Sequence, residues 1–196
     1  MLQRCGRNIP VTRHEVENVL DVYRPLLEAK IDRFLVTARE GPKTAGFCCG
    51  SSAALIKLLE VRFPEASFTM TGGYGADTAP CEGSEEYLDH SRYPGGMIDT
   101  DGNWRGHFWI ESVFADGTAF IVDATADQFG HPVAVVADID DRRYRKNLLP
   151  DVGYGDIVTD AEDNWGEQLF QEWSYRHMPE TAPVWLGNIS FSPTAR

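Results

Sequence analysis

Three residues of the sequence have side chains that could together carry out nucleophilic catalysis. Cys48 lies early in the chain, His107 begins an apolar and aromatic run, and Asp123 ends the next apolar run. A thiolate can attack a carbonyl carbon. An imidazole can take up the thiol proton and later protonate a leaving amine, while a carboxylate orients the imidazole and stabilises its charged form. Cys48, His107 and Asp123 are therefore the predicted catalytic residues.

The cysteine is expected at the start of a helix. The run from about 48 to 62 has the composition of a helix, and Pro64 stops it. At a helix N-terminus, the macrodipole and the unpaired backbone N–H groups favour a thiolate over a thiol. The same N–H groups can bind the oxyanion of a tetrahedral intermediate.

Cys49 is the neighbouring alternative to Cys48. At about 100° per residue, one helical stripe contains Cys48, Ser52, Leu55 and Leu59, and the next contains Cys49, Ala53, Ile56 and Glu60. The leucines should turn the first stripe toward the core and the sheet that bears the histidine, which favours Cys48 as the nucleophile. A second alternative is that both cysteines are small buried hydrophobic residues that only pack.

The histidine and the aspartate are expected on two paired strands of a hairpin. Apolar runs at 106–114 and 119–122 flank the turn Ala115-Asp116-Gly117. Both faces of the first run are mostly apolar, which predicts a central strand. Alternate residues of a strand face the same side, and a two-residue turn would put Asp123 on the face opposite His107. The triad therefore predicts an odd-length loop or a bulge between 114 and 119.

The remaining elements are predicted from caps, periodicity and breakers. Thr12 and Glu15 form a capping box before a helix that Pro25 should kink or divide into 13–23 and 25–39. The other expected elements are an irregular arm at 1–11, a strand at 66–71 that ends at Gly72-Gly73, a flap at 73–103, a strand at 132–137, a charged turn or short helix at 138–145, a helix at 161–177 and a tail at 183–196.

The composition favours one globular domain over residues 1–196 and disfavours several partners. The chain is 42% hydrophobic and 24% charged, with a net charge of -12 that would repel nucleic acid and anionic membranes. No apolar run reaches the ~18 residues that span a bilayer, and the N-terminus lacks a signal-peptide pattern. A cytoplasmic protein is expected, although delivery as an effector stays open.

The cysteine pattern gives no support for a metal site or a cofactor. The four cysteines contain no CxxC spacing, so a structural zinc site is disfavoured, and the thiols are expected to be reduced. Cys81 and His90 lie in the predicted flap, but no further ligand has suitable spacing. No cofactor and no metal are expected.

Three motifs resemble the transglutaminase-like branch of papain-like cysteine enzymes. They are Gly46-Phe47-Cys48 at a helix start, His107-Phe108-Trp109-Ile110-Glu111, and Val122-Asp123-Ala124-Thr125 followed by Gln128-Phe129. The resemblance covers about 46–63 and 104–130. It implies an α+β fold with a cysteine-bearing helix packed on an antiparallel β-sheet. It also implies Cys48 as nucleophile, His107 as general base and Asp123 as the orienting carboxylate.

The expected function is acyl transfer on an amide bond through a Cys-His-Asp triad. Peptidases, amidases or deamidases, and transglutaminases all use this chemistry, so a protein, a peptide or a small amide could be the substrate. One alternative is a non-catalytic binding or regulatory domain on the same scaffold, and another is a metal-dependent hydrolase with Cys, His and Asp ligands. Gln128 is a candidate oxyanion donor, but a structural hydrogen bond is favoured for it. The sequence does not indicate an oligomeric state.

Overall fold

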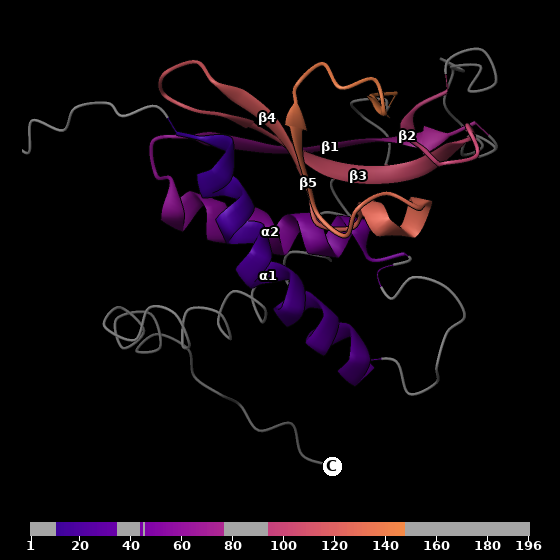
Figure 1. The fold of residues 1–196 in the computed structure, drawn as a ribbon, viewed down its shortest axis with the longest axis horizontal. Coiled ribbons are helices and arrows are strands. Elements are labelled where there is room, and N and C mark those ends of the chain that lie inside the picture. The colour runs from indigo at the N-terminus through magenta and orange to yellow at the C-terminus, as the bar shows by residue number, and fades with distance from the viewer. Residues whose placement is uncertain (1–10, 35–43, 45, 77–93, 148–196) are drawn as a thin grey trace, which may run out of the picture.

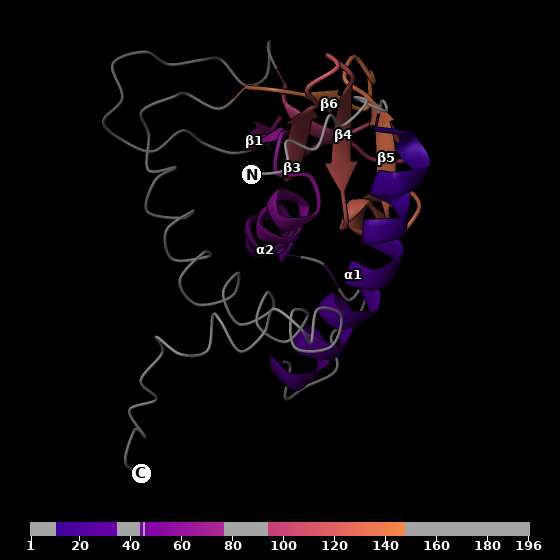
Figure 2. The same cartoon turned by 90° about the vertical axis from the view of Figure 1, so that its left-hand side faces the viewer.

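A computed structural model describes residues 11–34, 44, 46–76 and 94–147. These residues form an α+β fold in which two helices pack on one side of a curled antiparallel sheet (Figures 1 and 2). Several predictions lie outside the described residues: the N-terminal arm at 1–10, the helix end at 35–39, most of the flap with Cys81 and His90, the helix at 161–177, and the tail.

Helix α1 (Arg13–Phe34) begins at the predicted capping box. The Thr12 Oγ1 atom accepts the Glu15 N–H at 3.3 Å, and the Glu15 Oε2 atom accepts the Thr12 N–H at 2.9 Å. The helix continues through Pro25, so the division into two helices was wrong. Pro25 removes one helical hydrogen bond, but apolar side chains are buried on both sides of it. These are Val16, Val19, Leu20 and Tyr23 before Pro25, and Leu26, Leu27 and Ile31 after it.

Helix α2 (Cys48–Arg62) begins at Cys48, as the sequence predicted. The stripe that continues from Cys48 is buried at Ser52, Leu55 and Leu59. The stripe of Cys49 is mixed, because it ends at the exposed Glu60. The leucines of α2 and the apolar face of α1 pack with residues of the sheet that include Ile110, Phe114 and Val122. This cluster is the core between the helices and the sheet.

Within the part of the chain that the structure describes, six strands form the sheet. They are β1 (Ser67–Gly75), β2 (Gly96–Ile98), β3 (Trp104–Val113), β4 (Ala119–Asp123), β5 (Val135–Asp138) and β6 (Tyr144–Arg145), and a short 3-10 helix, η1 (Ala126–Phe129), follows β4. The strand order is β5-β4-β3-β2-β6, and β1 also pairs with β3. Strand β3 thus has three neighbours and is the predicted central strand.

Three strand predictions need correction. Strand β1 continues through Gly72 and Gly73 to Gly75, and β2 lies inside the region predicted as a loop. A Cβ atom on Gly73 would collide with the backbone of Gly96, and one on Gly72 would collide with the carbonyl of His107. The glycines therefore allow a close approach of backbones within the sheet, and they do not end the strand. Strand β5 begins at Val135, later than predicted.

The hairpin between β3 and β4 has the predicted odd-length loop. Ile110 pairs with Val122 and Glu111 with Ile121, so odd positions lie opposite odd positions. The Phe114 N–H donates to the Thr118 carbonyl at 2.9 Å, which leaves three residues, 115–117, in the loop. Gly117 has a φ of 85°, in the region that favours glycine.

The two faces of the sheet carry separate apolar clusters. Even-numbered residues of β3 face the helices, whereas the odd-numbered Trp109 belongs to a second cluster on the other face. The other members of this second cluster are Met97, Ile121, Ala126, Val135, Ala137 and Tyr144, with Phe129 packed against them. The leucine stripe of α2 therefore faces the side opposite His107, and only the N-terminal end of α2 approaches the histidine. The prediction that the stripe of Cys48 faces the core is confirmed. This orientation does not, however, explain why Cys48 lies near His107.

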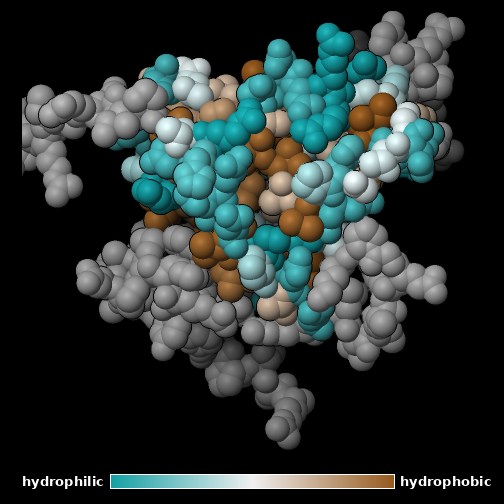
Figure 3. Space-filling model, in the orientation of Figure 1, coloured by the Kyte–Doolittle hydropathy of each residue, from teal (hydrophilic) through white to brown (hydrophobic). Residues whose placement is uncertain are grey.

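The face of the molecule seen in Figure 3 is mostly hydrophilic. Hydrophilic side chains cover most of the described residues in the view of Figure 3, with smaller hydrophobic areas between them. No helix among the described residues is long and apolar enough to cross a membrane.

Candidate active site

His107 and Asp123 form a buried pair. The His107 Nε2 and Asp123 Oδ2 atoms are 2.7 Å apart, and the two residues are 0% and 1% exposed. The register of the hairpin explains the contact, because continuing it by one residue puts Asp123 beside Trp109, the next residue after His107 on the same face of β3. The odd-length loop is thus what allows the two side chains to meet.

Asp123 is held by donors on both carboxylate oxygens. Its Oδ1 atom accepts the Thr125 N–H at 2.8 Å and the Thr125 hydroxyl at 3.1 Å, and its Oδ2 atom also accepts the Tyr144 hydroxyl at 3.0 Å. Burial alone would raise the pKa of Asp123, but the charge of His107 and these hydrogen bonds hold it below its usual value. The carboxylate is therefore ionised and fixed in direction.

Aromatic rings surround the imidazole of His107. The Phe129 ring meets it edge-on at 4.9 Å, Trp109 stacks with it at 6.3 Å, and Tyr144 lies at 6.5 Å. The Trp109 Nε1 atom is buried and has no hydrogen-bond partner in the part of the chain that the structure describes. These rings limit rotation of the imidazole about the bond to its backbone.

Cys48 lies near enough to the same imidazole to affect its pKa. Burial lowers the pKa of His107, but the Asp123 carboxylate and then a hydrogen bond from the Cys48 side chain raise it, to about 10. Cys49 instead lies 4.0 Å from the sulfur of Met70. The structure therefore brings Cys48, His107 and Asp123 together and directs Cys49 elsewhere.

The first turn of α2 presents backbone N–H groups beside Cys48. The first helical hydrogen bond runs from the Ser51 N–H to the Phe47 carbonyl at 2.9 Å. The N–H groups of residues 48–50 come before this bond, and the side chain of the N-cap residue, Phe47, makes no capping hydrogen bond. The first turn also contains no acidic residue, so its positive end is not neutralised there. This is the local geometry that can stabilise a thiolate or an oxyanion.

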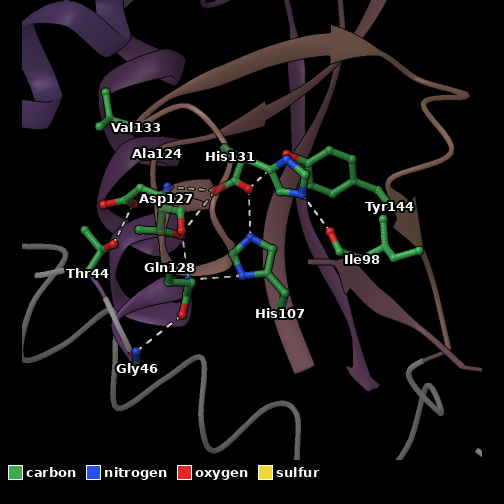
Figure 4. A network of polar contacts seen from close by, with 12 residues as sticks. Thr44, Gly46, Ile98, His107, Ala124, Asp127, Gln128, His131, Val133 and Tyr144 are labelled. Carbon is green, nitrogen blue, oxygen red and sulfur yellow. Dashed lines mark hydrogen bonds and ion pairs between the residues drawn. The ribbon is translucent and has the colours of Figure 1, made fainter. Parts of the chain in front are cut away.

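Gln128 connects the two sides of the site (Figure 4). Its Nε2 atom lies 3.3 Å from the His107 Nδ1 atom and donates to the Thr125 carbonyl at 3.0 Å, while its Oε1 atom accepts the Gly46 N–H at 3.4 Å. The structural hydrogen bond that the sequence favoured for Gln128 is confirmed. Gln128 thus links the histidine to the turn before Cys48.

A buried ion pair fixes η1, the helix that carries Gln128. The Arg24 guanidinium on α1 contacts both oxygens of Asp127, at 2.9 and 2.6 Å, and donates to the carbonyls of Ala124 and Val133. The Thr44 hydroxyl donates to the same Asp127 at 2.6 Å. Helix α1, the turn before Cys48 and the segment after Asp123 therefore meet at one carboxylate. Figure 4 shows the contact of Thr44 with Asp127.

Sequence reasoning missed Arg24 and Tyr144. Arg24 lies four residues after Leu20 and three before Leu27, so it falls on the buried stripe of the helix. An arginine there signals a buried acidic partner. Tyr144 lies between charged residues and gave no comparable signal, because only the curl of the sheet brings β6 to Asp123.

Among the described residues, no group of three or more His, Cys, Asp or Glu side chains could hold a metal ion. In comparisons with models of protein families, with curated proteins and with solved structures, nothing matched the chain.

Proposed function

We propose that the protein is a cysteine-dependent enzyme that transfers the acyl group of an amide. The observation that carries this proposal is one imidazole that Asp123 holds by a 2.7 Å hydrogen bond and whose pKa the nearby Cys48 side chain raises. A papain-like, transglutaminase-like core, a cytoplasmic location and a protein, peptide or small amide substrate belong to the same proposal. An acyl-transfer site of this kind needs no metal ion.

In the proposed mechanism, the Cys48 proton moves to the His107 Nδ1 atom and the sulfur attacks the carbonyl carbon of the amide. The carbonyl oxygen becomes an oxyanion, which the N–H groups at the start of α2 stabilise. Collapse of the intermediate breaks the C–N bond, and the amine leaves with the proton from Nδ1. Water or a second amine then gives a proton to Nδ1 and attacks the thioester, which releases the product and restores the Cys48 thiol.

Asp123 contributes by orientation and charge. Its Oδ2 atom accepts the Nε2–H of His107, so the lone pair of Nδ1 is directed away from Asp123 and can act as the base. When Nδ1 takes up the proton, the ionised carboxylate stabilises the imidazolium. The Tyr144 and Thr125 donors keep Asp123 in that position.

One observation favours the alternative, a non-catalytic binding domain on the same scaffold. His107 has no exposed surface, so its ring does not reach solvent directly. A base that acts on a substrate needs access to the leaving group. The reactivity of Cys48 separates the two functions, because a packed cysteine beside a structural histidine has no reason to be activated.

The test is alkylation with iodoacetamide across the pH range, with the rate at each cysteine followed by mass spectrometry. We expect Cys48 to react faster than Cys49, because the helix N-terminus and the neighbouring imidazole favour its thiolate. The His107→Gln variant should remove this advantage, whereas the matched Cys49→Ser variant should keep it. Equal rates at Cys48 and Cys49, unchanged in His107→Gln, would support the non-catalytic domain.

A further inference from the structure

The direction of the Gln128 side-chain amide is set by two partners outside the triad. The Thr125 carbonyl can only accept, so the atom facing it is the amide nitrogen. The Gly46 N–H can only donate, so the atom facing it is the amide oxygen. These two contacts together put the NH2 group of Gln128 at the Nδ1 atom of His107, 3.3 Å away (Figure 4).

An amide NH2 group can donate a hydrogen bond but cannot accept one. In the neutral ring, Nδ1 therefore offers its lone pair to Gln128, and the ring proton lies on Nε2, where Asp123 accepts it. If Nδ1 were protonated, two donors would face each other across this contact. Gln128 thus favours the form of His107 in which Nδ1 carries no proton.

Only one nitrogen of the His107 ring, Nδ1, is available to accept the Cys48 proton. Nε2 is bonded to Asp123, so transfer from sulfur must use Nδ1, the atom that Gln128 already contacts. We propose that Gln128 is a positioning residue that biases the proton shared by Cys48 and His107 toward the sulfur. Thiolate formation then requires the Gln128 amide to move away from Nδ1 or to rotate. This inference rests on the proposed function, since it concerns control of the same thiol.

The other polar groups around His107 either favour protonation of its imidazole or have no direct effect on it. Asp123 on β4 favours the imidazolium, and the Tyr144 phenol on β6 donates to Asp123. Asp127 lies next to Gln128 in sequence, but its carboxylate is paired with Arg24. Gln128 is therefore the polar neighbour in the described site that opposes protonation at Nδ1.

The same amide couples this bias to the turn before Cys48. Its Oε1 atom holds the Gly46 N–H, two residues before Cys48. The backbone of η1 is anchored through Asp127, which binds both Arg24 and Thr44. A displacement of Gly46 would therefore release the Gln128 side chain while η1 stays in place. Such a release would free Nδ1 and raise the thiolate fraction of Cys48.

The test compares the pH profile of Cys48 alkylation in the unaltered protein and in Gln128→Met. Methionine has a similar length but offers no donor to Nδ1, so the midpoint should move to lower pH. Loss of one net hydrogen bond of ~0.5–1.5 kcal/mol corresponds to a roughly 2- to 10-fold larger thiolate fraction at neutral pH. Cys49→Ser is the matched control, because Cys49 lies beside Met70 and away from the turn that holds Gln128, and it should not lower the midpoint.

A second variant covers the case in which the methionine protein does not fold. Gln128→Glu keeps the acceptor for Gly46 and turns an acceptor toward Nδ1. In a Cys48→Ala background, ¹⁵N NMR should then show that His107 keeps its Nδ1 proton to higher pH than with Gln128. Gln128→Met in that background should shift the titration in the same direction by less.

The outcomes separate the inference from the proposed function. An unchanged or higher midpoint in Gln128→Met, or no shift of the His107 titration in Gln128→Glu, would overturn the positioning role even if Cys48 is strongly reactive. An unreactive Cys48 in the unaltered protein, together with a shifted His107 titration in the variants, would support the positioning role and contradict the catalytic proposal.

Discussion

The substitution Arg24→Met tests whether the buried ion pair holds α1 to the site. Arg24 is 5% exposed, and its guanidinium binds both oxygens of Asp127, whose side chain is 14% exposed. Methionine keeps the straight stem, which packs in the helix, and removes all of the donors. The change therefore leaves the Asp127 carboxylate without its charged partner.

The expected loss of unfolding free energy is about 3–5 kcal/mol, the usual effect of removing one partner of a buried ion pair. The carbonyls of Ala124 and Val133 also lose a donor. The contact to the Val133 carbonyl is only partly buried, so water can replace its donor and that part of the cost is small. Against a typical stability of ~5–15 kcal/mol, the variant should be folded but clearly weakened.

Urea unfolding followed by circular dichroism measures the loss. The control is the same substitution in an Asp127→Asn background, where no charge is left unpaired and Arg24→Met should cost ~1–2 kcal/mol. A loss below ~1 kcal/mol in the original background, or an equal loss in both backgrounds, would show that the ion pair does not stabilise this junction.

Two further predictions use the same unfolding assay. Because the pKa of His107 is raised to about 10 from an unfolded value of ~6.5, its stabilisation is complete below the unfolded pKa and is lost as the pH rises toward about 10. The unaltered protein should lose up to ~1.4 kcal/mol per pH unit in that window relative to His107→Gln, and parallel slopes would contradict the shift. Gly117→Ala should lower the free energy of unfolding by about 1 kcal/mol, because φ at Gly117 is 85° and no atom lies near the added Cβ. Gly117→Asn should lower it by less, because asparagine tolerates this backbone conformation better. An alanine variant of full stability would contradict the backbone strain.

The sequence by itself determined the local features of the site. The start of α2 at Cys48, the capping box at Thr12, and the shared face of His107 and Asp123 all follow from residues close together in the chain. The odd-length loop could be predicted because strand residues alternate between two faces, so the count of residues between two positions decides whether they face each other. These features depend on backbone periodicity, which is a local property.

The tertiary structure decided which distant groups surround Cys48, His107 and Asp123. Arg24 and Asp127 are 103 residues apart, and Tyr144 reaches Asp123 only because the sheet curls. The choice of Cys48 over Cys49 as the neighbour of His107, and the direction of the Gln128 amide, likewise depend on how α2 and η1 approach each other. Periodicity fixes the side of an element on which a residue lies, whereas packing between elements decides what that side meets.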